Sequence, residues 1–451
     1  MRSSLVVLCA VLTIAGCREG DGPADPSVTD ARVYLASSPN GAQIIVDDRN
    51  TGQTTPDTVA LRRGDRSVVL RLDSAGFTYE YAFILEVERT DEVGEVTLPL
   101  GVRCLTAGGT CFQAARRHRD AANLRFATSA VGSLFHWGGS GSGIFWPAAT
   151  QNSYASAGIP LFGAEFDGDS AGMGMYDQAL LVGRPAPRVT VSGGGFRLEQ
   201  EAWVLPQPAG LSSPTSLRGI LIGQEIIGRD DIEGVLVLRL TYRNVSDDPL
   251  VHLFAPHIPD AAVTYTNAWI GFALDADIGA AADDWLSYDA DMDMVFAYDA
   301  DFATAFVGAD ADAPGLVGLR VLEAPAGTNV MLNSWSSGFD WNAGRSGEHA
   351  GFGMLSGSSV FAPAHAHTKI GHLPPAIGDI RMSVTAGPIT LEPGAEVRIV
   401  IAVAVAPPVA GTFTSGVTVS PGDPLDTSRQ LYNVAGILRA RMTAAEALAG
   451  I

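Results

Sequence analysis

The chain is poor in positive charge and in cysteine, and each shortage excludes a class of function. It carries 29 Lys and Arg against 49 Asp and Glu, which gives a net charge of −20. An acidic protein repels phosphate backbones and anionic headgroups, so we expect no nucleic acid among its partners. Only four cysteines are present, and none of them forms a Cys-x-x-Cys pair. The common cysteine-based zinc and redox motifs are therefore not expected.

Long hydrophobic runs are also missing, although the composition is apolar enough for a large core. Hydrophobic residues make up 47% of the chain and charged residues 17%. This composition excludes a disordered chain. The apolar run 399–406 follows Glu396 and Arg398 and is far shorter than the ~20 residues of a membrane-spanning helix. It predicts a buried strand.

The first seventeen residues predict export. A positive start at Arg2 precedes an apolar run from Leu5 to Ile14, and small residues then lead to Cys17. This is a secretory signal peptide over residues 1–16. Ile14-Ala15-Gly16-Cys17 resembles the bacterial lipobox, which implies lipidation of Cys17 and attachment to a membrane. Two alternatives are a signal peptide followed by an incidental cysteine, and an uncleaved membrane helix.

Two further expectations concern the start of the mature chain. Residue 18 is Arg rather than Asp, which among lipoproteins favours the outer membrane. Residues 17–31 are rich in Gly, Asp, Pro, Ser and Thr, with no apolar period. They predict a flexible tether.

Cys104 and Cys111 remain after Cys9 leaves with the signal and Cys17 takes the lipid. A Gly108-Gly109 turn lies between them. In an oxidising compartment this spacing favours a disulfide that closes a small hairpin. The alternative is a metal or redox pair.

Residues 32–100 predict a small β domain with alternating strands and Gly-rich turns. The ordered motifs are Ser38-Pro39-Asn40-Gly41-Ala42, Val46-Asp47, then Gly52, Thr54 and Pro56, and finally Gly64, Val68 and Gly76-Phe77. In this order they resemble the PEGA domain. The resemblance implies a β-sandwich without catalytic residues.

The rest of the chain predicts a mainly β protein that ends in a helix. Short apolar or alternating runs between turn residues over 101–410 favour a larger antiparallel β-sandwich, in one or two subdomains. Within 411–451, Leu431, Val434, Leu438 and Met442 follow the helical period. The segments 241–244, 269–279 and 387–402 resemble large secreted bacterial β proteins of unknown function, and this resemblance implies no activity.

The acidic segment 275–301 is the sharpest candidate for chemistry. Its carboxylates are Asp275, Asp277, Asp283, Asp284, Asp289, Asp291, Asp293, Asp299 and Asp301. Alternating carboxylates beside a Gly turn can supply the oxygens that calcium requires, although the EF-hand pattern is not met. One hypothesis is a calcium site made by Asp275, Asp277, Asp283 and Asp284. The alternative is a set of solvated aspartates that guard a strand edge.

Two weaker motifs point to catalysis or to a transition metal. Gly168-Asp169-Ser170-Ala171-Gly172 fits Gly-x-Ser-x-Gly, with His349 or His372 as the base. A nucleophile elbow needs a strand before the serine and a helix after it, and Met173–Tyr176 does not begin a helix. The histidines His365, His367 and His372 could ligate a metal, but Pro-rich surroundings favour a loop.

Trp335 and Trp341 stand among polar residues and glycines. Exposed rings of this kind stack on sugars, whereas buried rings fill the end of a sandwich.

From the lipobox, the tether and the PEGA motifs together, we expect a non-enzymatic, lipid-anchored envelope protein that binds or scaffolds other envelope components. The alternative is a carbohydrate-binding or carbohydrate-active surface protein.

Overall fold

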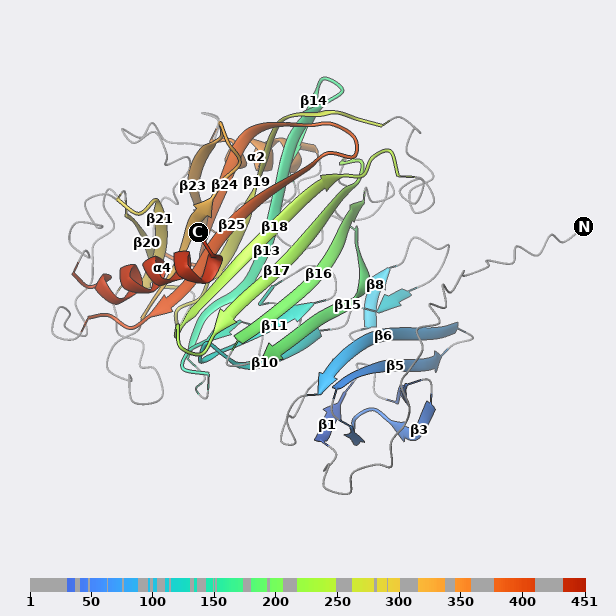
Figure 1. The fold of residues 1–451 in the computed structure, drawn as a ribbon. Helices are drawn as coiled ribbons and strands as arrows, with labels where there is room; N and C mark the ends of the chain where they lie inside the picture. Colours follow the sequence, from blue (N-terminus) through green and yellow to red (C-terminus); the bar gives the residue numbers. More distant parts are fainter. Residues whose placement is uncertain are drawn as a thin grey trace, which may run out of the picture.

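The computed structural model describes most of the chain from residue 31 onward. The described residues are 31–36, 41–47, 49–62, 64–74, 77–87, 96–97, 100–103, 110–112, 115–129, 134–135, 143–148, 150, 152–172, 180–192, 195–205, 217–248, 262–279, 282–289, 291–300, 315–336, 345–357, 377–409 and 433–451. They form a mainly β protein with several antiparallel sheets and a C-terminal helix, as the sequence predicts (Figure 1).

The N-terminal unit is a small two-sheet structure. Its strands are β1 (Ala31–Leu35), β2 (Gln43–Val46), β3 (Arg49–Thr54), β4 (Asp57–Leu61), β5 (Gly64–Ser74) and β6 (Phe77–Val87). β1 pairs with β4, and the other four form a sheet in the order β3-β2-β5-β6. Alternating side chains of both sheets, such as Val33, Ile44 and Leu70, are buried in one core.

A buried threonine holds the residues that precede β2. Gly41 has a φ of +99°, which favours glycine, and its N–H donates to the Thr55 carbonyl at 2.7 Å. The Thr55 hydroxyl in turn accepts from the N–H of Ala42 at 3.0 Å. These bonds tie the start of β2 to the turn before β4.

The larger region contains two long sheets. The first has the order β23-β24-β19-β13-β12-β11-β10-β7, with β14 paired to β13. Its strands are β7 (Val96–Thr97), β10 (Ala115–Ala121), β11 (Leu124–Ser129), β12 (Ile144–Phe145), β13 (Ser153–Phe166), β14 (Asp169–Gly172), β19 (Tyr265–Ala276), β23 (Asn329–Ser336) and β24 (Ile380–Leu391). We call it the nine-stranded sheet.

The second sheet has eight strands in the order β15-β16-β17-β18-β25-β22-β21-β20. They are β15 (Leu180–Ser192), β16 (Gly195–Leu205), β17 (Ile220–Arg229), β18 (Val235–Asn244), β20 (Asp284–Asp289), β21 (Met294–Asp299), β22 (Leu316–Glu323) and β25 (Glu396–Ala406). We call it the eight-stranded sheet. The apolar run 399–406 lies in β25, and its residues are buried as predicted.

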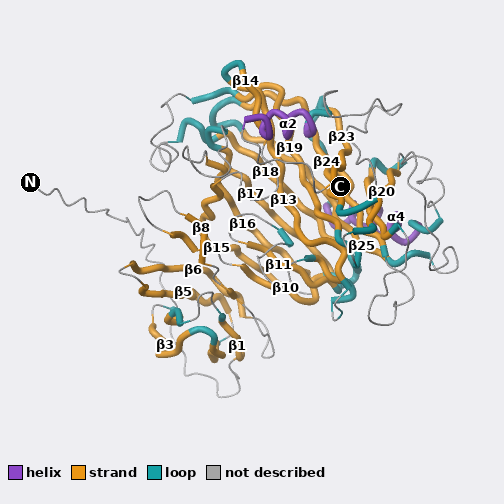
Figure 2. Tube along the Cα trace, turned by 180° about the vertical axis from the view of Figure 1, so that it is seen from behind, coloured by secondary structure: helices purple, strands orange, loops and turns teal. Residues whose placement is uncertain are grey.

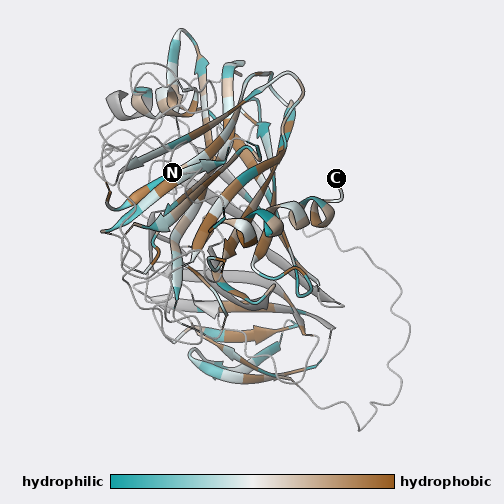
Figure 3. Cartoon of the chain, turned by 90° about the vertical axis from the view of Figure 1, so that its left-hand side faces the viewer, coloured by the Kyte–Doolittle hydropathy of each residue, from teal (hydrophilic) through white to brown (hydrophobic). Residues whose placement is uncertain are grey.

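The two sheets face each other across one hydrophobic core, which residues from both sheets fill between positions 124 and 405. The strands of these two sheets therefore share one core. Tyr242 of β18 crosses this core, because its hydroxyl donates to the Gly271 carbonyl of β19 at 2.6 Å. Figure 3 shows long hydrophobic stretches on the strands of the sandwich.

Helices cover the outer faces of both sheets. α2 (Arg345–Leu355) packs on the nine-stranded sheet through Phe352, Met354 and Leu355. α4 (Gly436–Ala449) packs on the eight-stranded sheet through Leu438 and Met442. Figure 2, seen from behind, shows the two helices on opposite sides of the sandwich. No helix within the described ranges is long and apolar enough to cross a membrane.

β7 pairs with β10 of the nine-stranded sheet. Within the described residues, the last strand of the N-terminal unit is β6, which ends at Val87. The predicted hairpin around the cysteines is present, because β8 (Leu100–Arg103) and β9 (Thr110–Phe112) pair antiparallel. Cys104 lies outside the described residues, so the disulfide to Cys111 stays a prediction.

Candidate functional site

Three described carboxylates lie close together where the chain passes from one sheet of the sandwich to the other. Asp275 is near the end of β19, and Asp277 follows the strand. Asp379 directly precedes β24, which pairs with β19 so that Asp275 faces Arg381. Pairing of two neighbouring strands therefore brings together residues that are about a hundred positions apart in the sequence.

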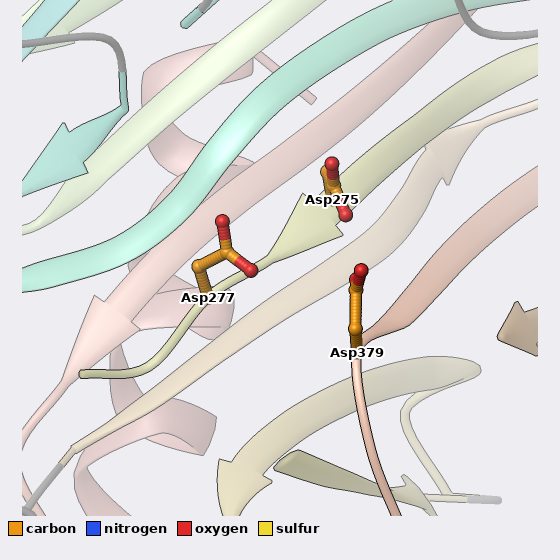
Figure 4. Close-up of side chains that lie close together, drawn as sticks. All are labelled: Asp275, Asp277 and Asp379. Carbon is orange, nitrogen blue, oxygen red and sulfur yellow. The ribbon is translucent and has the colours of Figure 1, made fainter. Parts of the chain in front are cut away.

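The carboxylates of Asp275, Asp277 and Asp379 form a compact group, which we call the aspartate cluster. One oxygen of each lies within 4.8 Å of an oxygen of each of the others. Figure 4 shows the three side chains converging from the end of β19, the turn after it and the segment before β24. Asp275 is buried, and the other two are half-buried.

Arg381 supplies positive charge beside this cluster. Its Nη2 lies 3.2 Å from Oδ2 of Asp275, and its Nη1 lies 3.2 Å from Oδ1 of Asp379. One guanidinium therefore forms ion pairs with two of the carboxylates, Asp275 and Asp379. The pKa of the Asp277 carboxylate is shifted mainly by its burial. Burial raises the pKa of Asp277 to about 6, and the charges of Asp275 and Asp379 add to this effect against a hydrogen bond from Ser156.

Asp284, the first residue of β20, lies next to the aspartate cluster. Its Oδ2 accepts from the N–H of Ile278, the neighbour of Asp277, at 3.3 Å. Its carbonyl accepts from the N–H of Gly378, the neighbour of Asp379, at 3.1 Å. Asp284 therefore lies between the two segments that carry Asp277 and Asp379, and it belongs to the opposite sheet.

The carboxyl of Asp284 is completely buried. Burial raises its pKa to about 9, and the nearby charges of Asp277, Asp299 and Asp283 raise it further. Its Oδ1 is buried and accepts no hydrogen bond from any described residue. A buried polar atom without a partner costs free energy, so this oxygen marks a place where a ligand would be favourable.

The donor set of the cluster and Asp284 consists of carboxylate oxygens. Within the described part of the chain, no histidine or cysteine joins the group. Oxygen donors suit hard cations such as calcium, and they suit softer transition metals less well.

The structure thus brings together Asp275, Asp277 and Asp284 of the predicted set and adds Asp379. Asp283 lies beside them, and its carbonyl accepts from Ala300 at 2.8 Å. Sequence reasoning missed Asp379 because the pairing of β19 with β24 cannot be seen in local spacing. Asp379 reaches the group because β24 pairs in register with β19. The contact between Arg381 and Asp275, which are 106 residues apart in sequence, shows this register.

The second half of the acidic segment has another role. Asp289 is buried and forms an ion pair with Arg439 of α4, and Asp291 lies 4.0 Å from the same guanidinium. Neither sequence-based alternative foresaw this contact. Solvated strand-edge aspartates do not describe Asp284, Asp289 and Asp299, because all three are buried.

The Gly-x-Ser-x-Gly motif lies on a β-hairpin. Asp167 and Gly168 have φ of 50° and 78° and connect β13 to β14, so a strand rather than a helix follows Ser170. Ser170 Oγ nevertheless lies 2.9 Å from Nδ1 of His349, whose Nε2 lies 3.4 Å from Oδ1 of Asp169. The His349 and Asp169 side chains are 47% and 36% exposed. The contact is a surface bridge between β14 and α2, without the strained turn of a nucleophile elbow.

Trp335 is only 1% exposed and packs with Trp269, Met331 and Met354 beneath α2. This corrects the expectation that it binds a sugar, since a buried ring offers no face for stacking. The other candidates lie outside the described residues: Cys17, Trp341, Asp301, His365, His367 and His372.

Comparison with known proteins supports the assignment of the N-terminal unit. Residues 31–89 match the family model of the PEGA domain, in agreement with the two small sheets of β1 to β6. No curated protein matches the chain. Among solved structures, a galactose 1-epimerase from Lactobacillus acidophilus NCFM aligns with 69% of this chain and 98% of its own, at 10% identity and a TM-score of 0.29. So low a score supports no argument about fold or function.

Proposed function

We propose that the protein is an exported envelope protein, held to the outer membrane by a lipid on Cys17, which binds or scaffolds other envelope components without catalysis. The observation that supports this proposal best is the PEGA domain at residues 31–89, a domain typical of extracellular and periplasmic proteins. In the sequence it follows the predicted tether over residues 17–31, which begins at Cys17 of the lipobox-like Ile14-Ala15-Gly16-Cys17.

A role without catalysis fits the geometry of the described residues. The interior of the sandwich is filled by large side chains, including Phe162, Tyr265 and Phe272, whose exposed fractions are zero. The motif with the clearest catalytic spacing, around Ser170, lies on an exposed hairpin where water screens any charge that a reaction would develop. A surface that binds or spaces partners needs neither an internal cavity nor a site shielded from water.

Carbohydrate binding is the alternative, and no observation now favours it. The ring of Trp335 is buried. A glycan array probed with the purified chain tests it directly. Reproducible binding to one glycan class would replace the scaffolding proposal by this alternative.

The lipid anchor is tested by cell fractionation of matched cysteine variants. Cys17→Ala should release the protein from the membrane fraction and remove incorporation of a labelled fatty acid. Cys9→Ala is the control, because Cys9 leaves with the signal peptide and should not affect anchoring. If Cys17→Ala stays in the membrane fraction after a high-salt wash, the anchor proposal is wrong.

A further inference from the structure

We propose that Asp275, Asp277, Asp379 and Asp284 bind one calcium ion, which joins the nine-stranded sheet to the eight-stranded sheet. The first three residues lie at the end of β19 and the start of β24, and Asp284 opens β20. The inference does not depend on the lipid anchor. It uses the extracytoplasmic location only for its supply of calcium.

The spacing of the aspartate cluster suits calcium. Calcium binds oxygens at about 2.3–2.6 Å, so two ligands on opposite sides of the ion are separated by roughly twice that distance. The oxygens of Asp275, Asp277 and Asp379 all lie within 4.8 Å of one another. Three carboxylates can therefore share one ion without a rearrangement of the backbone.

Asp284 is an independent observation that points to a ligand. It comes from the other sheet, is completely buried, and has an oxygen, Oδ1, that accepts no hydrogen bond from the described residues. Its Oδ2 is held by the N–H beside Asp277, and its carbonyl by the N–H beside Asp379. The carboxyl group is thus fixed between the segments that supply the other ligands.

The positive charge of Arg381 is directed at two other members of the group and not at Asp284. Its two terminal nitrogens contact Asp275 and Asp379. The charges that act most strongly on Asp284 are those of Asp277, Asp299 and Asp283, all of one sign. A divalent cation would offset this repulsion and would use the buried oxygen of Asp284 as a ligand.

Calcium titration of the full chain, purified in detergent and freed of metal with a chelator, tests the proposal. Calorimetry should detect one site, and saturating calcium should raise the melting temperature by about 2–8 °C. Magnesium should not replace calcium, because it demands a smaller and stricter octahedral shell. Asp277→Asn and Asp379→Asn should remove binding, whereas Asp230→Asn, at an exposed turn, should retain it.

Thermal unfolding of each variant in chelator separates the loss of calcium binding from a loss of folding. Asp277→Asn removes a charge that repels its neighbours, so it should melt no lower than the unchanged chain in chelator while losing the response to calcium. The proposal is overturned if calcium does not bind, if magnesium has the same effect, or if Asp277→Asn still responds. Release of the Cys17→Ala protein from membranes is a separate result, so the two proposals fail independently.

Discussion

Asp284 and Asp299 face each other as register partners at the ends of β20 and β21, and both side chains are completely buried. Two carboxyl groups so close in a region of low dielectric cannot both be ionised without a large cost, unless a cation lies near them. In the absence of a cation, we therefore expect at least one of these two carboxyl groups at the edge of the eight-stranded sheet to be protonated.

In chelator, this equilibrium should make stability fall as pH rises. Asp284 has a pKa raised from 3.8 to about 9 in the folded protein. Between these values the folded chain binds a proton that the unfolded chain does not bind, so its contribution to the free energy of unfolding decreases by at most about 1.4 kcal/mol per pH unit. The difference in melting temperature between Asp284→Asn and the unchanged chain should therefore grow from about pH 4 to about pH 9.

Calcium should change the sign of this dependence. Protons compete with the ion for carboxylates, so the stabilisation by calcium should grow as pH rises. The exposed Asp230→Asn variant should track the unchanged chain at every pH. A difference between Asp284→Asn and the unchanged chain that does not vary with pH would show that Asp284 is not protonated in the folded protein.

Tyr242→Phe should lower the free energy of unfolding by about 1–3 kcal/mol. The change deletes the hydroxyl that donates to the Gly271 carbonyl across the core and leaves the ring in place. Chemical denaturation followed by fluorescence measures the loss. Tyr34→Phe, at a half-buried position of the PEGA domain, is the control and should cost less; equal losses would mean that the cross-sheet bond adds nothing.

Leu438→Ala should destabilise the sandwich by about 2–5 kcal/mol, because it leaves a cavity under α4. The side chain is fully buried and lies over Gly318 of β22, where a Cβ would come within 3.3 Å of its Cδ2 and 2.9 Å of Met442 Cε. Thr443→Ser, on the exposed face of the same helix, should be nearly neutral. Thermal unfolding compares them, and equal melting temperatures would contradict the docking of α4.

Ser170 should not react with a fluorophosphonate probe that labels activated serines. Its contact with His349 has the distance of a catalytic pair, but the hairpin is open to water and Ser170 lies within the strand β14. Labelling is compared with that of Ser170→Ala by gel fluorescence. Labelling that disappears in Ser170→Ala would overturn the assignment of a role without catalysis.

Patterns that extend over a few residues predicted the fold class well. Alternation identified strands such as β18, and helical spacing of Leu438 and Met442 identified α4. The PEGA motifs could be found because they are turns, whose residue types depend on local backbone geometry. The pairing order of the large sheets could not be predicted, because strands far apart in sequence, such as β18 and β25, lie side by side.

The candidate site shows the same division. Asp275, Asp277 and Asp284 are close in sequence, and their alternation with a Gly turn indicated a shared site. Asp379 and Arg381 joined them only through the register of β24 against β19. The role of Asp289 also depended on a distant element, because its partner Arg439 is 150 residues away. From the sequence alone, an aspartate that could bind a metal ion cannot be told apart from one, such as Asp289, that forms an ion pair with a helix.

The position of β25 has a consequence for how the protein reaches its native state. β25 lies between β18 and β22 in the middle of the eight-stranded sheet, although it is the last strand in the described part of the chain. Until residues 396–406 are available, β18 and β22 each present an open edge to other chains. Contacts this distant in sequence form slowly and leave intermediates prone to aggregation. A chain whose central strand comes this late exposes these edges until residues 396–406 pair, so truncations before residue 396 should accumulate as insoluble material.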